Sequence, residues 1–134
     1  MSKQFLLKVP AIIFALVIFV LSQIPAEMLP PKVFDLQDKL LHLLAYFLFG
    51  ITLVIATITM KNKRKRIVLI ILFGSLYALL DEVHQMFVPG RYWDLTDWFA
   101  DTLGVFLALF FVGKIRLLLE KFLKIDFDED TIQG

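Results

Sequence analysis

Residues 40–60 read LLHLLAYFLFGITLVIATITM, an apolar run without a single Asp, Glu, Lys or Arg. An α-helix needs about 20 predominantly apolar residues to cross the ~30 Å hydrocarbon core of a bilayer. Two further stretches, residues 67–88 and 98–119, are equally long and carry their few charged side chains toward their ends. Each of these three stretches therefore predicts a membrane-spanning helix.

A fourth apolar stretch occupies residues 9–24, near the N-terminus. Its length would also suit a signal peptide, but the flanking sequence SQIPAE (residues 22–27) lacks a clean small-x-small cleavage site. We therefore expect a retained first span over residues 9–27. Four all-apolar helices in one short chain would leave no amphipathic layer to face water, which argues against a soluble protein. The predicted fold is an all-α, integral membrane four-helix bundle, a single domain over residues 1–134 with a tail at 120–134.

The composition excludes several classes of function. Of the 134 residues, 59% are apolar, against about 45–50% in an ordinary soluble domain, so intrinsic disorder is excluded. The chain has no Cys, which excludes a disulfide scaffold, a thiol enzyme and a cysteine metal site. The net charge of +1 argues against a nucleic-acid partner, because duplex binders need a concentrated basic surface.

The basic residues predict the orientation of the bundle. Eleven Lys and Arg residues lie at the N-terminus, between residues 61 and 66 and in residues 114–124, whereas the other two connections carry three. Because basic residues are enriched in cytoplasmic loops, this bias predicts that both termini are cytoplasmic. The eight acidic residues from Glu27 to Asp101 and both His residues then fall at or near the outer face.

These polar residues share narrow helical stripes with small or aromatic residues. At 100° per residue, the stripes are Asp38, His42, Tyr46 and Phe49; Gly74, Ala78, Asp81 and Gln85; and Asp97, Asp101, Gly104 and Ala108. Small residues let helices approach closely in lipid. The sequence therefore predicts an acidic, His-containing cup that is open to the outside and closed on the cytoplasmic side.

An ionisable side chain that faces lipid at mid-depth costs at least ~2.5–3.5 kcal/mol, so such residues turn inward and usually carry function. The candidates for catalysis are Glu82, His84, His42 and Asp101. The candidates for ligand binding are Asp38, Lys39, Asp81, Gln85, Arg91 and Asp97. We expect Arg91 to pair with at least one of the acidic residues of the cup, namely Glu82, Asp97 and Asp101, because an unpaired cation beside apolar walls is costly.

Simpler roles are open for some of these residues. Asp38 and Lys39 could be ordinary interfacial residues at a helix start, and Asp97 could be the N-cap of the last span. The aromatic residues Tyr92, Trp93 and Trp98 are typical of an interfacial belt. The acidic segment at residues 81–85 is harder to explain in this way, because four of its five residues are polar inside an apolar span.

Three polar segments form a recognisable pattern: DKLLH at residues 38–42, DEVHQMFVPGR at 81–91, and Asp97 followed by DTLG at 101–104. The pattern resembles that of the VanZ-like family, which combines an acidic-Glu-x-His-Gln box, a Pro-Gly-Arg turn and a later Asp-x-x-x-Asp or Asn with Gly. The match covers roughly residues 10–110. The resemblance implies a four-helix domain in the bacterial plasma membrane. The best-known family member is linked to teicoplanin resistance, but the family supplies no established reaction.

Three functions are open for the cup. It could bind or modify the head group of an envelope lipid or a glycopeptide-related ligand, because Arg and Lys suit phosphate. It could serve a metal-assisted or acid–base enzyme, although no HExxH or comparable spacing appears, so we predict no metal ligands and no named cofactor. It could also be a structural lock of ion-paired residues. Because acidic residues outnumber Arg91, we expect a protonated carboxyl group near neutral pH or a bound cation.

Overall fold

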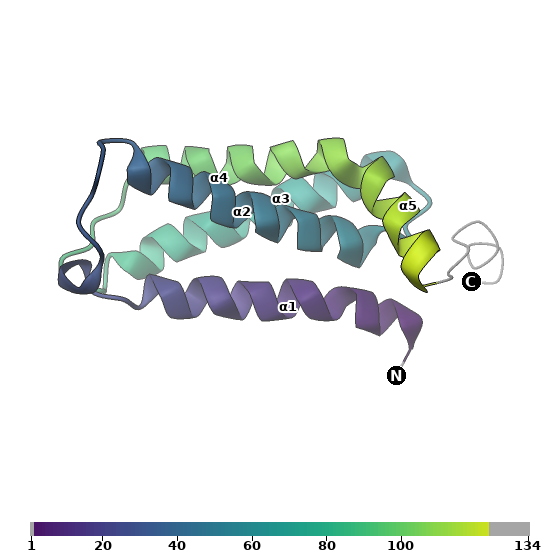
Figure 1. Ribbon diagram of the computed structural model, residues 1–134, viewed down its shortest axis with the longest axis horizontal. Coiled ribbons are helices and arrows are strands. Elements are labelled where there is room, and N and C mark those ends of the chain that lie inside the picture. The colour runs from purple at the N-terminus through teal and green to yellow at the C-terminus, as the bar shows by residue number, and fades with distance from the viewer. Residues whose placement is uncertain (1, 124–134) are drawn as a thin grey trace.

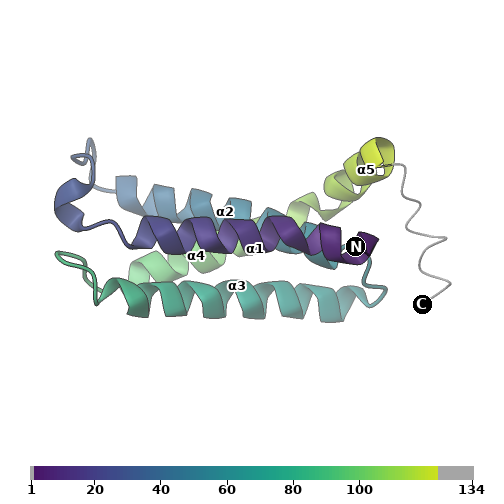
Figure 2. The same cartoon turned by 90° about the horizontal axis from the view of Figure 1, so that it is seen from below.

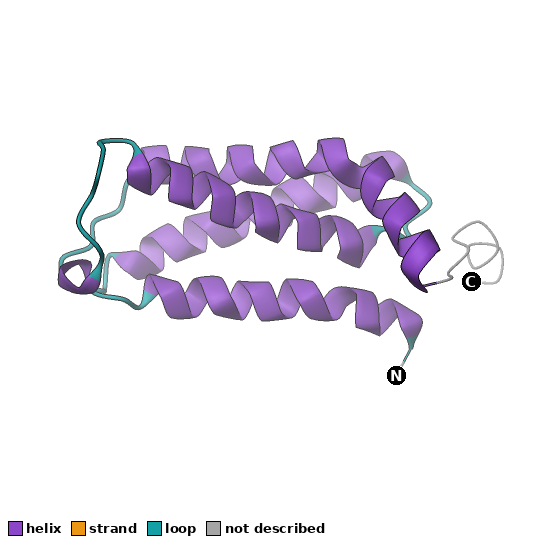
Figure 3. Cartoon of the chain, in the orientation of Figure 1, coloured by secondary structure: helices purple, strands orange, loops and turns teal. Residues whose placement is uncertain are grey.

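The computed structural model describes residues 2–123, and every regular element in this part of the chain is helical (Figures 1 and 3). The elements are α1 (Lys3–Ser22), the 3₁₀ turn η1 (Ala26–Met28), α2 (Gln37–Thr57), α3 (Lys63–Gln85), α4 (Leu95–Ala108), the 3₁₀ turn η2 (Leu109–Phe111) and α5 (Val112–Leu123). The predicted all-α fold is confirmed. Part of the predicted tail, residues 124–134, lies outside the described residues.

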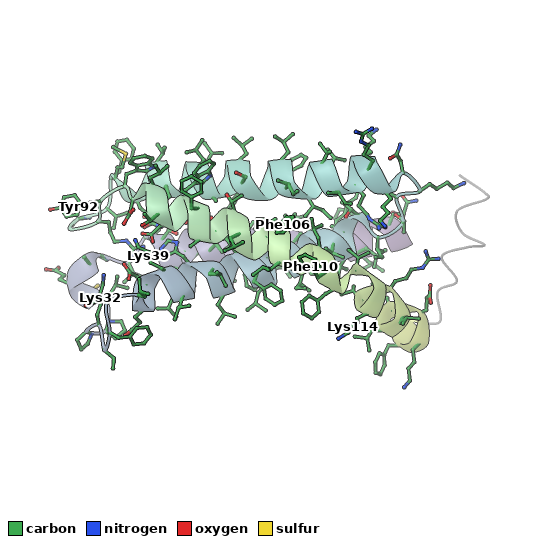
Figure 4. All side chains as sticks on the ribbon, turned by 90° about the horizontal axis from the view of Figure 1, so that it is seen from above. Lys32, Lys39, Tyr92, Phe106, Phe110 and Lys114 are labelled. Carbon is green, nitrogen blue, oxygen red and sulfur yellow. The ribbon has the colours of Figure 1, made fainter. Side chains whose placement is uncertain are left out.

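Four helical segments are long and apolar enough to cross a membrane: Gln4–Ser22, Gln37–Thr57, Lys63–Gln85 and Leu95–Phe122. The four long helices lie side by side and alternate in direction (Figures 1 and 2). Large apolar side chains are exposed along all of them, for example Leu16, Leu44, Leu72 and Phe106 (Figure 4). Soluble monomers rarely expose so continuous an apolar surface. The chain is therefore a multi-pass membrane protein.

The helices begin earlier than the predicted spans, at residues 3, 37, 63 and 95 rather than 9, 40, 67 and 98. Hydropathy marks only the apolar part of a helix, whereas capped polar turns extend it. The side chains of Ser2, Asn62 and Asp94 accept hydrogen bonds from first-turn N–H groups of α1, α3 and α4. The first helix also ends at Ser22 instead of residue 27, consistent with the preference of residues before Pro25 for extended backbone.

Glycines let the helices pack at backbone distance. A Cβ atom at Gly104 of α4 would overlap the α2 backbone at Leu43 and would lie 2.8 Å from the amide nitrogen of Phe47. At Gly50 of α2, a Cβ atom would lie 2.7 Å from the Cβ atom of Ala108. These contacts leave no room for a larger residue, so α2 and α4 pack tightly together below the polar residues, as small residues allow in lipid.

The fourth membrane segment is bent, which the sequence analysis did not predict. The 3₁₀ turn η2 separates α4 from α5, and α5 leaves the direction of α4 (Figures 1 and 2). Phe111 of this turn packs edge-on against Phe47, with ring centroids 5.5 Å apart, and Gly113 follows in α5. Short 3₁₀ pieces and glycines are common places for a helix to change direction. The residues before and after the bend are both apolar, so the hydropathy of the sequence does not indicate where the helix changes direction.

Candidate functional site

Polar side chains converge at the end of the bundle that carries the loops at residues 23–36 and 86–94, here called the polar end (Figure 4). His42 lies in the second turn of α2, Glu82 near the end of α3 and Asp101 in the second turn of α4. Nδ1 of His42 lies 3.0 Å from Oδ1 of Asp101 and 3.9 Å from Oε1 of Glu82. Its Nε2 lies 4.0 Å from Oδ2 of Asp97. Four residues predicted to share a cup therefore meet.

Lys39 is the principal cation of this end. Its Nζ lies 2.5 Å from Oδ2 of Asp94 and 2.6 Å from Oδ1 of Asp97, so one ammonium group joins the start of α2 to the start of α4. We call the assembled residues the polar cluster; they are Lys39, His42, Glu82, Asp94, Asp97 and Asp101.

Asp94 is the member of the polar cluster that was not among the predicted site residues. Its Oδ1 accepts hydrogen bonds from the backbone N–H and the hydroxyl of Thr96, and it caps α4 where Asp97 was considered as the cap. Its own N–H donates to Oε2 of Glu82 at 3.0 Å. The hydrogen bond from Lys39, with those from Thr96, lowers the pKa of Asp94 from its ordinary value of 3.8 to about 2. An Asp before an apolar helical run is a capping signal, but Asp94 and Asp97 both satisfy it.

The deepest carboxylates are fully enclosed by protein. Glu82 and Asp101 each have 0% of their surface exposed. Oε1 of Glu82 and Oδ2 of Asp101 have no hydrogen-bond partner within the described part of the chain. A buried carboxylate without a full set of partners is costly, so these two oxygen atoms are positioned to take a proton, a donor group or a cation.

Gln85 connects a second group of predicted residues beside the polar cluster. Its Nε2 donates to Oδ2 of Asp81 at 3.1 Å, and its Oε1 accepts from Nη2 and Nε of Arg91 at 2.7 and 3.2 Å. Gly90 has a φ of 73°, the left-handed conformation that glycine adopts readily, in the turn that carries Arg91.

The expected ion pair of Arg91 with Glu82, Asp97 or Asp101 is wrong. Among the described residues, Arg91 makes no ion pair. Gln85 holds its guanidinium edge, while Lys39 neutralises the start of α4 from the neighbouring helix. The sequence distances gave no means of choosing between the two cations.

Two predicted site residues lie apart from the centre of the polar cluster. The His84 ring stacks on Phe19 of α1, with centroids 4.8 Å apart, and makes no hydrogen bond or ion pair with the described carboxylates. Asp38 lies at the rim, where its Oδ2 is 2.9 Å from Nζ of Lys32 and 3.8 Å from Nζ of Lys39. His84 therefore belongs to the contact between α1 and α3.

The aromatic residues near the polar end divide into two groups. Tyr92 and Trp93 are exposed, as an interfacial belt requires. Trp98 differs from them, because this half-buried residue packs against the core and its Nε1 donates to the carbonyl oxygen of Ser75 at 3.1 Å. The presence of a Trp near the start of α4 does not by itself reveal whether its side chain packs against the other helices or faces the lipid.

Comparison with known proteins supports the sequence pattern. No curated protein and no solved structure shows significant similarity to this chain. A family model described as VanZ/LLP1 matches residues 4–116, which include all four membrane segments up to the start of α5 and every residue of the polar cluster. The chain therefore belongs to the VanZ/LLP1 family of membrane proteins.

Proposed function

We propose that this protein binds the polar head group of a cell-envelope lipid, or a glycopeptide-related ligand, at the polar end of the bundle. Arg91 carries the proposal. Its guanidinium group is held by Gln85 and has no carboxylate partner among the described residues, so its charge is available to an anionic group. A guanidinium group matches the geometry of phosphate.

The surroundings of Arg91 suit a ligand that enters from the membrane surface. Gly50 and Gly104 let α2 and α4 pack tightly on the inner side of the polar cluster. The distribution of Lys and Arg favours an outward-facing polar end and cytoplasmic termini in a bacterial plasma membrane. Asp94 and Asp97, the carboxylates of the cluster that are not fully enclosed, would accept hydrogen bonds from sugar hydroxyl or peptide amide groups of the same ligand. Chemical modification of the ligand would use the half-buried His42 as the acid–base group, with the enclosed Glu82 and Asp101 behind it.

Native mass spectrometry of the full chain with phosphatidylglycerol and with a polyprenyl diphosphate tests this function. Arg91→Gln removes the available cation, and Arg64→Gln removes an equal charge from the first turn of α3, at the opposite end of the bundle. We expect Arg91→Gln to reduce the bound fraction of at least one lipid and Arg64→Gln to leave it unchanged. Equal binding by all three proteins would contradict the proposal.

A role in teicoplanin resistance is the finer form of the same proposal. A protein that binds an envelope precursor at the outer surface would compete with a glycopeptide antibiotic for it. Expression in a teicoplanin-susceptible bacterium should raise the inhibitory concentration of teicoplanin, and Arg91→Gln should abolish the increase at equal protein level. An unchanged inhibitory concentration would restrict the proposal to lipid binding.

A structural lock is the second candidate, and the double ion pair of Lys39 favours it. This single ammonium group contacts two carboxylates at the start of α4 and would hold α2 and α4 together without any ligand. The variants Lys39→Met, which removes the double ion pair, and Arg91→Gln, which removes the available cation, distinguish the two functions. A lock predicts loss of folded protein or a lower melting temperature, whereas a binding site predicts intact protein with reduced ligand binding.

A further inference from the structure

The geometry points to a divalent transition-metal site formed by His42, Glu82 and Asp101. This inference is independent of the proposed head-group binding, because the three residues would bind the metal ion without a lipid. It also goes against the expectation from sequence spacing, since the ligands come one each from α2, α3 and α4 rather than from a single motif.

The spacing of the three side chains suits coordination of one ion. One ligand atom from each residue can be chosen so that all three lie within 4.8 Å of one another. Metal–ligand distances of about 2.0–2.2 Å for His nitrogen and carboxylate oxygen place neighbouring ligands of a tetrahedral ion about 3.5 Å apart. The distances from Nδ1 of His42 to the two carboxylates, 3.0 and 3.9 Å, already bracket that value. Small side-chain rotations would complete the site.

The two carboxylates retain free coordination capacity inside the protein. Both are fully buried, and Oε1 of Glu82 and Oδ2 of Asp101 have no hydrogen-bond partner in the described structure. The N–H of Asp94 binds the other oxygen of Glu82, so Oε1 is the atom left facing His42. Oδ1 of Asp101 contacts Nδ1 of His42, and its second oxygen, Oδ2, is the one without a donor. Two enclosed carboxylates beside one imidazole, each with an oxygen atom that has no donor, distinguish this site from an ordinary surface cluster of acidic residues.

The charge balance favours a bound cation. The polar cluster holds four carboxyl groups, of Glu82, Asp94, Asp97 and Asp101, and its permanent cation is Lys39. Lys39 pairs most closely with Asp94 and Asp97, so His42 is the side chain of the polar cluster that can offer Glu82 and Asp101 a positive charge. Buried carboxylates need pairing, protonation or a metal ion, and a dication would neutralise both.

The ligand types identify the class of metal. One imidazole with two carboxylates suits Zn²⁺ or Mn²⁺, whereas Mg²⁺ and Ca²⁺ prefer oxygen ligands alone. A neutral His42 would bind through Nδ1 and keep a proton on Nε2. That nitrogen faces Oδ2 of Asp97 at 4.0 Å, in the position of an outer carboxylate that orients a metal-bound His. The fourth coordination position would be left for water or a ligand oxygen.

Calorimetric titration of the detergent-purified, chelator-treated full chain with Zn²⁺ alone is the first test. We expect one saturable site per chain. Asp97→Asn should weaken binding by about 10–100-fold, as outer carboxylates usually do, and Glu82→Gln and Asp101→Asn should weaken it further. Glu27→Gln, at an acidic residue of the first loop, should have no effect. Absence of a saturable site in the unmodified protein would overturn the inference and favour protonated carboxyl groups.

Spectroscopy with Co²⁺ tests direct coordination, because the natural chain has no Cys and any thiolate-to-metal band must come from an introduced residue. Asp101→Cys should give such a band. Thr102→Cys is the matched control, since Thr102 follows on α4 but its hydroxyl bonds to Oγ of Ser75 at 3.1 Å. Glu82→Cys replaces Asp101→Cys if the latter does not fold. No band in a folded site variant, or an equal band in the control, would overturn the inference.

The two proposals can fail separately. If the unmodified protein binds lipid but not Zn²⁺, only the proposal of a metal site is contradicted. Loss of lipid binding in Arg91→Gln with unchanged Zn²⁺ binding would support both proposals, since Arg91 is not a metal ligand.

Discussion

At the scale of single residues, Asp94 joins three helices. Its side chain caps α4 and pairs with Lys39 of α2, and its backbone N–H binds Glu82 of α3. Because the pKa of Asp94 is lowered to about 2, the folded state binds its proton less readily than the unfolded chain does. Ionised Asp94 therefore stabilises the fold at pH values above its ordinary pKa of 3.8, and this stabilisation disappears as the pH falls toward 2.

We predict that Asp94→Ala destabilises the protein by about 0.5–2 kcal/mol near neutral pH, chiefly through the lost cap. Thermal unfolding in detergent would measure the difference in melting temperature from the natural protein. This difference should be constant between about pH 7 and 5 and should narrow on acidification below about pH 4. Asp35→Ala, in the exposed first loop, is the control. A difference that persists unchanged into the acid range would mean that Asp94 does not act through its charge.

Gly104 is the residue at which a side chain is least tolerated, because α2 backbone atoms occupy the space around it. We predict that Gly104→Ala destabilises the protein by about 1–3 kcal/mol, as overpacking usually does. Gly113→Ala is the matched control, since no atom lies within 4 Å of its added Cβ and Ala favours a helix by about 0.8–1.0 kcal/mol over Gly. The control should keep or raise the melting temperature. Equal melting temperatures for both variants would contradict the close packing of α2 and α4.

At the scale of secondary-structure elements, α5 differs from the membrane helices. It buries Ile115 against the core, but it exposes the apolar side chains of Leu117, Leu118 and Phe122 together with Lys114 and Lys121. At 100° per residue, Leu118 and Phe122 share one face of α5 with Ile115, whereas Leu117 lies on the side of Lys114 and Lys121. A short helix with an apolar face and basic residues beside it is typical of a helix that lies in the interface of a membrane. The bend at η2 turns it out of the direction of α4 (Figure 1).

We predict that α5 rests on the membrane surface beside the bundle. Single-Cys variants Phe122→Cys and Lys121→Cys, spin-labelled in vesicles, would test this position. The label at residue 122 should be more accessible to oxygen, which dissolves in lipid, and the label at residue 121 to a water-soluble nickel reagent. Equal accessibility of both labels to the nickel reagent would place α5 in water instead.

The elements also show what a single sequence can predict. Long apolar runs without charged residues, such as residues 40–60, identify the membrane helices with no further information. The ends of the helices are harder to predict, because capping by Ser2 or Asn62 depends on local backbone geometry. The bend before α5 leaves no compositional signal, since it depends on how Phe111 meets Phe47 of another helix.

At the scale of the whole molecule, α1 begins and α5 ends near the same end of the bundle, away from the polar end (Figure 2). Four membrane segments of alternating direction require this arrangement. The basic loop around residues 61–66 lies at that same end, so the charge distribution and the fold together favour one orientation.

We predict that the start of α3 at Lys63 faces the cytoplasm and that the loop around Asp35 faces outward. In intact cells, a membrane-impermeant thiol reagent should label Asp35→Cys and should leave Lys63→Cys unlabelled. Lysed cells provide the control, because both variants should then react. Labelling of Lys63→Cys in intact cells would reverse the orientation and place the polar end in the cytoplasm.

The assembly of the site was predictable only in part. Helical periodicity placed Glu82 and Asp101 on buried faces, because an ionisable residue in an apolar span has few other positions. The same periodicity could not decide that Lys39 rather than Arg91 neutralises α4, nor that His84 turns toward Phe19 of α1. Those outcomes depend on how each helix is rotated about its axis and on the path of a loop. The spacing of residues in the sequence determines neither.

The bend after Ala108 has a consequence for the surrounding lipid. At about 1.5 Å per residue, α1, α2 and α3 are about 30–35 Å long, whereas α4 covers about 21 Å and η2 adds about 6 Å. A hydrophobic segment shorter than the bilayer core is accommodated by local thinning of the bilayer. The bilayer would therefore be thinner beside α4 than beside the other three helices. We therefore expect a lopsided depression in the leaflet nearest α5, and a preference for short or disordered acyl chains at that position.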